Sequence, residues 1–377
     1  MRQRVDALLH YRPYDRLPLV HFSFWGETVN KWAAEGHLTA AQLATGGRGI
    51  GKRLGFDFDW LDGTFSPATG LRPLFQARDL ETLPDGTTKV LNPWGVVVLQ
   101  KAGTSGIPAE VDHLLKDRKS WEELYLPKLQ WSEQRVTDAM VRLRDVPLPF
   151  DKGGRELLLD EDREAYFGLH CGSLFGEIRN WLGLENACYL QVDDEPLFDE
   201  IVNTVGNLCY RCTETALASG ARFDFAHFWE DICFKNGPLI APAVFEAKIG
   251  PHYRRITDLV HAHGIDIVSL DCDGMIDALI PTWLKNGVNT MFPIEVGTWN
   301  GNLGPWRARY GRELRGVGGT DKRVFAEDRA AVDAEIERLR RLVDLGGFIP
   351  CPDHRIAPDA AWDNVRYYVD RMRATFG

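Results

Sequence analysis

The chain has 377 residues, 44% of them hydrophobic and 26% charged, which is the composition of a globular protein with ample material for a core. The formal net charge of −10 argues against nucleic acid or an anionic membrane as the main partner. No apolar run approaches the roughly 20 residues that span a bilayer.

The start of the chain shows no apolar segment or cleavage site of the kind that signal peptides carry. The seven cysteines are odd in number and lack the spacing of a disulfide framework, which fits a reducing compartment. We therefore expect a cytoplasmic protein.

Strand-like segments recur along the chain. In order they are Leu17–Trp25, Ala165–Ser173, Arg222–Asp231, Ile265–Gly274, Val288–Val296, Leu314–Lys322 and Phe348–Pro352. Helical patterns follow most of them, and between Ala326 and Leu345 the apolar residues recur at steps of three and four. This alternation is typical of parallel βα units, and about seven strands favour an eight-stranded barrel. We predict an α/β fold, a single (β/α)8 TIM barrel over residues 1–377.

The region at about 67–151 breaks the alternation. The stretch from Asp85 to Gly103 predicts a hairpin with Asp85–Gly86 near its turn. The rest of the region is rich in glycine, proline and charge. We interpret it as an insertion-like excursion from the barrel rather than as a second domain.

Polar, ionisable residues follow almost every predicted strand. Because all strands of a βα barrel end at one face, these residues should converge around one mouth. They are Glu230, Asp271, Asp273, Glu295, Asp321 and His354. Like-charge repulsion should raise the pKa of some of these carboxylates, unless a cation or the side chains of Lys322 and Arg355 offset it. Helix capping is the structural alternative for each terminal aspartate.

The pattern predicts a general acid/base site or a metal site. The candidate catalytic residues are Glu230, Asp271, Asp273, Asp321 and His354. The candidate ligands of a divalent metal are Asp271, Asp273 and His354. The candidate substrate-binding residues are His21, Trp25, His170, Trp229, Glu295, Lys322 and Arg355. An EF-hand is excluded because Thr282 stands where its bidentate carboxylate should be. No phosphate-binding loop or dinucleotide fingerprint is present, so we expect no nucleotide cofactor.

Several stretches of the second half carry a family resemblance. They are Gly172–Asn186, Glu230–Pro242, Leu270–Pro281, Gly287–Val296, Gly318–Val324 and Pro352–Asn364. In order and spacing the sequence resembles the superfamily of uroporphyrinogen decarboxylase and the corrinoid- and zinc-dependent methyltransferases. The resemblance implies a (β/α)8 barrel with its site at the carboxyl face of the strands.

The branches of that superfamily differ in their residues. The decarboxylases carry arginines after an early strand to bind substrate carboxylates, whereas Leu17–Asn30 here contains no arginine. The zinc methyltransferases hold zinc through His-x-Cys and a later cysteine, whereas Asp271, Asp273 and His354 occupy those places here.

The resemblance therefore implies methyl transfer from a small methylated molecule, such as a methoxylated one, to a corrinoid on a separate carrier protein. Acid groups or a divalent metal, zinc or another, would act on the leaving oxygen. One alternative is a decarboxylase of a tetrapyrrole or small acid, with Lys322, Arg323 and Arg355 as its cationic clamp. Another is a non-catalytic barrel that binds a tetrapyrrole or a partner protein. Besides the carrier protein, a second copy of the chain, in a homodimer, is a candidate partner.

Overall fold

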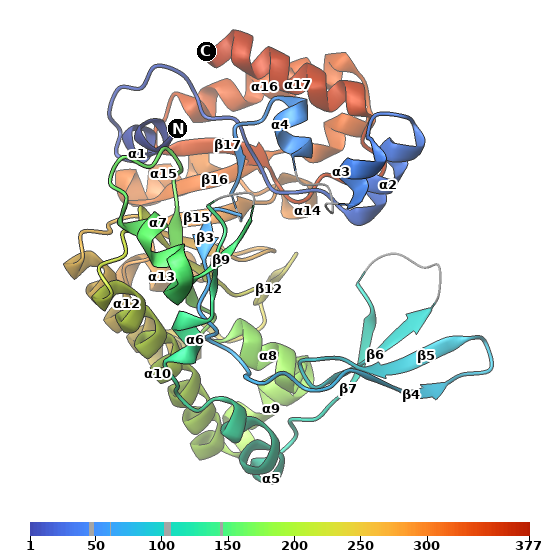
Figure 1. Cartoon of the computed structure of the whole chain (residues 1–377), viewed down its shortest axis with the longest axis vertical. Coiled ribbons are helices and arrows are strands. Elements are labelled where there is room, and N and C mark those ends of the chain that lie inside the picture. Colours follow the sequence, from blue (N-terminus) through green and yellow to red (C-terminus); the bar gives the residue numbers. More distant parts are fainter. Residues whose placement is uncertain (45–48, 61, 102–106, 144–145) are drawn as a thin grey trace.

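A parallel barrel forms the centre of the molecule (Figure 1). The computed structural model describes residues 1–44, 49–60, 62–101, 107–143 and 146–377. Seven strands make one parallel sheet in the order β17-β16-β15-β14-β11-β10-β3. Their bounds are β3 (Thr64–Phe65), β10 (Gly168–Gly172), β11 (Phe225–Trp229), β14 (Val268–Asp271), β15 (Thr290–Ile294), β16 (Arg315–Thr320) and β17 (Phe348–Pro352).

Two short strands complete the ring. β1 (Val20–His21) pairs in parallel with β2 (Phe58–Asp59), and β3 follows β2 along the chain. On its other side the segment after β1 meets the segment after β17 through a parallel bridge between Phe24 and Ile356. With β2 and β3 taken as one interrupted strand, eight strand positions close a circle. The predicted (β/α)8 barrel is confirmed.

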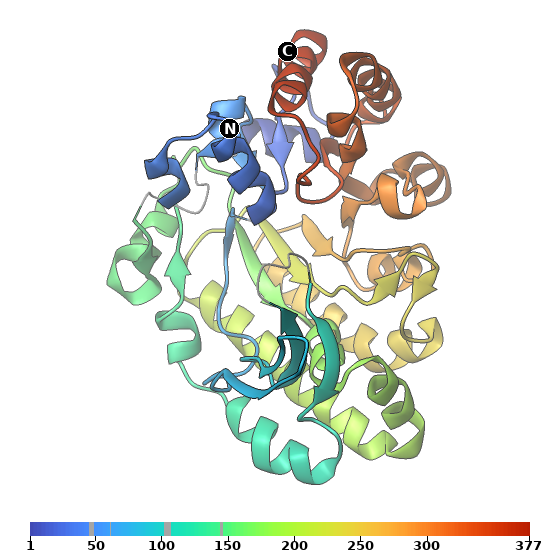
Figure 2. The same cartoon turned by 90° about the vertical axis from the view of Figure 1, so that its right-hand side faces the viewer.

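Helices cover the outside of the barrel, and Figure 2 views the molecule from the side of the strands' carboxyl ends. Those that follow barrel strands include α8 (Gly176–Leu182), α9 (Leu184–Asp193), α10 (Glu195–Ala218), α12 (Gly250–Ala262), α13 (Ile280–Lys285), α14 (Val296–Trp299), α15 (Leu303–Tyr310), α16 (Arg329–Val343) and α17 (Trp362–Phe376). Near the amino end lie α1 (Arg2–Leu9), α2 (Gly26–Ala34), α3 (Ala40–Ala44) and α4 (Ile50–Leu54). Of the helices in the described parts of the chain, none is both long and apolar enough to cross a membrane.

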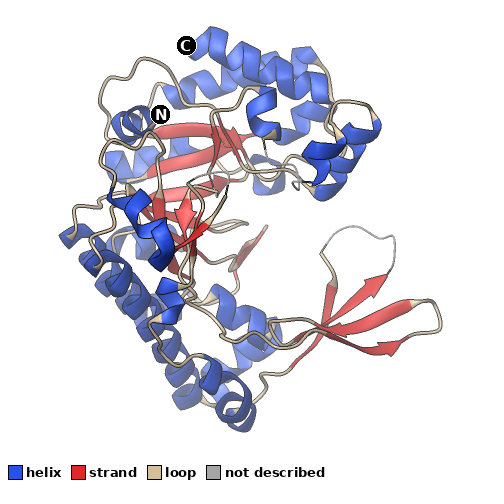
Figure 3. Cartoon of the chain, in the orientation of Figure 1, coloured by secondary structure: helices blue, strands red, loops and turns tan. Residues whose placement is uncertain are grey.

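The predicted excursion contains an antiparallel sheet of four strands (Figure 3). They are β4 (Arg78–Thr82), β5 (Thr87–Leu91), β6 (Val96–Lys101) and β7 (Ala109–His113). The predicted turn at Asp85–Gly86 joins β4 to β5, while Ala102 and Gly103 lie outside the described residues. This sheet projects on the same side of the barrel as α14, that is, beyond the carboxyl ends of the strands (Figure 1). The boundaries at about 67 and 151 stay a prediction.

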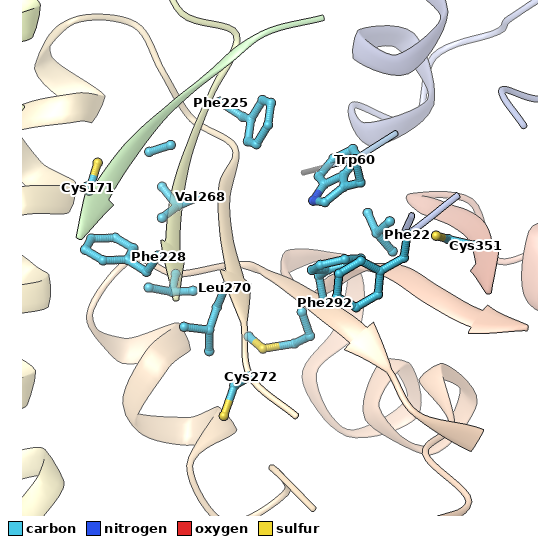
Figure 4. Packing of buried hydrophobic residues seen from close by; sticks show 14 of the residues in the cluster. Phe22, Trp60, Cys171, Phe225, Phe228, Val268, Leu270, Cys272, Phe292 and Cys351 are labelled. Atoms are coloured by element: carbon cyan, nitrogen blue, oxygen red, sulfur yellow. The ribbon is translucent and has the colours of Figure 1, made fainter. Parts of the chain in front are cut away.

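Alternate residues of the barrel strands point inward and outward, because side chains of a strand alternate between its two faces. Inside, the ring of Phe22 lies 4.7 Å from that of Phe292, and Trp60 stacks 5.0 Å from Phe225. Phe228 lies on the other face of β11 and packs toward the helices (Figure 4). This alternation decides which polar residues at the strand ends can reach the mouth.

Candidate active site

Three carboxylates meet at the carboxyl ends of β11 and β14, and we call them the aspartate cluster. Asp231 follows β11, Asp271 ends β14, and Asp273 comes two residues later. One oxygen from each lies within 4.8 Å of the oxygens from the other two. The register aligns Trp229 with Asp271, so the parallel pairing of β11 and β14 brings Asp231, two residues after Trp229, close to Asp271.

Asp231 was not among the predicted site residues, although strand alternation could have identified it. Phe225, His227 and Trp229 occupy one face of β11, and the next residue of that series is Asp231. Its backbone adopts a left-handed conformation, with φ of 49°. The Asp273 backbone N–H donates to Asp231 Oδ1 at 3.1 Å, which ties the two loops together.

Asp271 is the most unusual member of the cluster. Asp271 is only 5% exposed, and its carboxylate accepts no hydrogen bond from any residue that the structure describes. Burial, Asp231 and Asp273 raise its pKa well above the usual range, against the opposing charge of Arg355. Burial and Asp273 likewise raise the pKa of Asp231 to about 7. Such a cluster retains protons near neutral pH or attracts a cation.

His354 links the aspartate cluster to the aromatic rim of the mouth. Its Nε2 lies 3.3 Å from Asp273 Oδ2. The imidazole meets the edge of Phe22 at 5.1 Å and stacks on Trp25 at 5.7 Å with an angle of 27° between the rings. The structure therefore brings together the predicted residues Trp25, Asp271, Asp273 and His354.

Glu295 lies beside the aspartate cluster and positions the loop that carries Asp273. Its carboxylate accepts hydrogen bonds from the Gly274 backbone N–H at 2.6 Å and from Thr298 Oγ1 at 2.8 Å. Gly274 has φ of 86°, and a Cβ there would stand 2.4 Å from the carbonyl oxygen of Cys233. Burial and Asp273 raise the pKa of Glu295. This glycine and Glu295 together fix the turn after β14.

The surroundings of Glu230, which was predicted as catalytic, indicate a structural role. It is 0% exposed, and its carboxylate accepts hydrogen bonds from the backbone N–H groups of Leu174 (2.9 Å), Phe175 (2.9 Å) and Gly176 (2.6 Å). The Tyr253 hydroxyl also donates to it. Strand alternation turns Glu230 toward α8 and α12, away from the barrel interior. Its contacts account for the residue without a substrate, so we leave it out of the proposed catalytic set.

Asp321 and Lys322, at the end of β16, are engaged in local contacts. Asp321 accepts a hydrogen bond from the Arg323 backbone N–H at 3.0 Å and receives the guanidinium of Arg323 at 2.7 Å. Burial would raise the pKa of Asp321, but the bonds from Arg323 lower it. Lys322 Nζ lies 3.4 Å from the buried Asp353. Asp321 thus matches the helix-cap alternative that its position at a strand end left open.

The structure does not bring His21 and His170 to the aspartate cluster. Since Phe22 faces the interior, His21 faces outward, where a Cβ added to Gly51 of α4 would stand 2.1 Å from its Nε2. His170 aligns in register with His227, below the level of Trp229 and Asp271. Burial lowers the pKa of His21 to about 3 and that of His170 to about 4, so both imidazoles are neutral at pH 7.

The donor set fits a hard divalent cation. Three carboxylates with an adjacent imidazole are ligands that magnesium, manganese, iron and zinc accept. The Asp271 carboxylate lacks a described donor, and Asp273 Oδ1 is buried without a hydrogen-bond partner. Cys272 supplies no thiolate here, because burial raises the pKa of its thiol well above the usual range despite the bond that its Sγ accepts from the Ile232 backbone N–H. The thiol-activating zinc site of the methyltransferase branch is therefore not reproduced.

Comparisons with known proteins bear on the fold. No protein-family model and no curated protein sequence matches the chain. Among solved structures, a methyltransferase from Methanosarcina mazei matches with 12% identity and a TM-score of 0.61, over 99% of this chain and 98% of that one. A structure described as that of a vitamin-B12-independent methionine synthase from Listeria monocytogenes has 12% identity, a TM-score of 0.41, and coverage of 97% and 100%.

At 12% identity, the likeness to the Methanosarcina mazei protein shows the fold alone. The resemblance predicted from the sequence is thus confirmed at the level of the fold: this chain has the α/β-barrel fold of that methyltransferase.

Proposed function

We propose that the chain is a methyltransferase that takes a methyl group from a small methylated molecule and passes it to a corrinoid on a separate carrier protein. The observation that carries the proposal is the aspartate cluster with His354 beside it, at the carboxyl face of the barrel. The fold likeness to a methyltransferase supports the activity class. The sequence resemblance supports the corrinoid as acceptor.

The cluster suits the difficult part of this reaction. An ether oxygen leaves poorly as an alkoxide, so it must gain a proton as its bond to the methyl carbon breaks. Asp271 is buried beside two other carboxylates, which keeps a proton on the cluster. In our proposal Asp271 donates that proton to the leaving oxygen. His354 contacts both Asp273 and the rim, so it can restore the proton from solvent.

A divalent cation would occupy the same place. Asp231, Asp271 and Asp273 would hold it, with His354 adjacent, and it would supply Lewis-acid polarisation of the leaving oxygen. Protons and the cation compete for the same carboxylate oxygens. Because either neutralises the cluster, the role of the cluster as an acid centre is the same in both cases.

A decarboxylase of a small acid is the second candidate. Two arginines near the cluster favour it. Arg179 donates through Nη2 to the carbonyl oxygen of Asp231 at 2.7 Å, and its Nε is buried without a partner. Arg355 lies near enough to Asp271 to influence its pKa. Either cation could attract a substrate carboxylate.

The test combines metal content and turnover. The purified chain is analysed for bound metals and then mixed with cob(I)alamin and a panel of methoxylated aromatic compounds, and methylcobalamin is followed by its absorbance. We expect turnover that falls about 100- to 10,000-fold in Asp271→Asn, and in His354→Gln a smaller loss. The matched control is Asp333→Asn, because Asp333 pairs with Arg371 on the helical surface.

The outcomes separate the candidates. A bound metal that is lost in Asp271→Asn assigns the cluster to Lewis-acid chemistry, and a metal-free active parent assigns it to proton transfer. Release of carbon dioxide from small aromatic acids, without methyl transfer from any compound of the panel, would overturn the proposal in favour of the decarboxylase. Equal turnover in the parent and both variants would remove the cluster from the reaction.

A further inference from the structure

Arg355 is held over the face of Trp25 at the rim of the mouth. Its guanidinium carbon lies 5.5 Å from the centre of the indole ring. Trp25 also stacks on His354, whose Nε2 contacts Asp273. A continuous line of contacts therefore runs from the aspartate cluster through His354 and Trp25 to Arg355.

The backbone fixes this arrangement. The Trp25 backbone N–H donates to the carbonyl oxygen of Ile356 at 3.2 Å, next to the parallel bridge between Phe24 and Ile356. Thr28, in the first turn of α2, donates to the same carbonyl oxygen through Oγ1 at 2.8 Å. Trp25 and Arg355 are thus positioned by the strand pairing that closes the barrel, not by two independent loops.

The guanidinium of Arg355 has no polar partner among the described residues: it makes neither a hydrogen bond nor an ion pair with any of them. Its neighbour on the adjacent strand end, Arg323, is bonded to Asp321 through the side chain. An arginine that stays unpaired beside several carboxylates, while stacked on an indole, keeps its planar donor fork available.

We propose that Arg355 binds an anionic group of the substrate, and that the substrate is a methylated aromatic acid, flat and carrying a carboxylate. That the substrate is methylated rests on the proposed function. That it is an aromatic acid rests on the surroundings of Arg355 and Trp25. The guanidinium matches a carboxylate through two parallel N–H bonds. The indole of Trp25 and the imidazole of His354 place aromatic groups beside that guanidinium, which suits an aromatic substrate.

This placement orients the substrate. With its carboxylate on Arg355, a flat substrate that extends along the line of contacts toward the barrel axis would place a methoxyl group on the far side of its ring near His354 and the aspartate cluster. The positive charge of Arg355 also opposes the rise in the pKa of Asp271, which is consistent with this arrangement. Arg355 thereby selects acids over neutral ethers of the same shape.

Binding measurements test the inference without turnover. Titration calorimetry of the full chain is performed with 4-methoxybenzoate, benzoate and the neutral isostere 4-methoxybenzamide. In Arg355→Gln we expect the affinity for both acids to fall about 10- to 100-fold, the usual range for loss of a charge-assisted pair. The affinity for the amide should stay the same. Arg355→Lys should recover part of the loss, since it keeps the charge without the fork.

The matched control is Arg323→Gln, which removes one positive charge from the neighbouring strand end and should leave all three affinities unchanged. The inference is overturned when acid and amide bind the parent equally, when Arg355→Gln binds the acids like the parent, or when neither acid binds the parent. Arg355-dependent binding of acids without any methylcobalamin formed leaves this inference standing and overturns the proposed function. If methyl transfer is equally fast from the acid and the amide, and equally fast in Arg355→Gln, the proposed function stands and this inference is overturned.

Discussion

Glu230 and Asp231 are adjacent in sequence and both follow β11, yet their surroundings are opposite. The Glu230 carboxylate receives three backbone N–H groups and the Tyr253 hydroxyl. Asp231 instead faces two other carboxylates and has its pKa raised by burial and by Asp273. The hydrogen bonds to Glu230 favour its charged form, although burial still raises its pKa, whereas at Asp231 burial and the charge of Asp273 act together against the charged form. The donors around a buried carboxylate therefore indicate its role better than its position at a strand end does.

The largest effect we expect follows from removing the charge of Glu230. In Glu230→Gln the amide NH₂ must face at least one backbone N–H that now lacks an acceptor. We expect a loss of roughly 2–4 kcal/mol in the free energy of unfolding, the cost of orphaned buried donors and a lost charge-assisted bond. Chemical denaturation of the parent and the variant measures it.

The structural role of Glu230 is contradicted if Glu230→Gln has the stability of the parent but loses turnover. Glu230 would then belong to the reaction, as predicted from the sequence. The matched substitution is Asp271→Asn, which is the same change from carboxylate to carboxamide at another buried strand end. It should have the opposite effect on stability at alkaline pH.

Much of this arrangement could be predicted from the sequence. Long strand segments with helices between them predicted the barrel, and Asp271, Asp273 and His354 were expected to meet because parallel strands end at one face. The strands β2 and β3 were missed because each is only two residues long and the sequence between them ends in Asp62 and Gly63, a pair typical of turns. Short pairings of this kind depend on their neighbours, which no local pattern reveals.

The different roles of Glu230 and Asp231 could not be predicted from the sequence. Alternation along β11 indicates that they face opposite sides, but only the packing shows that α8 approaches Glu230 closely. A Cβ on Gly176 would stand 1.9 Å from the Glu230 carbonyl oxygen. The backbone N–H groups that donate to Glu230 belong to residues more than fifty positions earlier, and Tyr253 lies 23 positions later, so sequence proximity could not supply these partners.

A divalent cation should act on the aspartate cluster alone. At a concentration a hundredfold above its dissociation constant, a cation that binds only the folded chain stabilises it by about 2.7 kcal/mol. We expect magnesium, manganese or zinc to raise the melting temperature of the parent at pH 8, and a chelator to reverse the rise. Asp271→Asn should show little response. An equal rise in both proteins would place the cation elsewhere.

The pH dependence of Asp271→Asn sharpens the comparison further. Burial and the neighbouring aspartates raise the pKa of Asp271, so the folded chain keeps a proton that the unfolded chain releases near pH 4. Ionisation of Asp271 therefore stabilises the unfolded chain, and the free energy of unfolding falls as pH rises above about 4. In the presence of a chelator we expect Asp271→Asn to be more stable than the parent at pH 8, by on the order of 1–2 kcal/mol. Near pH 4 the two should melt alike, and a difference that does not vary with pH would contradict this account.

The smallest effect should come from Asp321, which was predicted as catalytic and which the structure gives a local role. Asparagine can still accept the hydrogen bond from the Arg323 backbone N–H, so Asp321→Asn loses only the pairing with an exposed guanidinium. We expect a stability loss of about 0.5–1 kcal/mol at neutral pH and turnover within about twofold of the parent. Since Arg323 lowers the pKa of Asp321, this contribution is present at neutral pH and disappears as acid protonates the folded carboxylate. A loss of turnover beyond about tenfold without a matching loss of stability would return Asp321 to the catalytic set, because capping alone cannot change a reaction barrier by that amount.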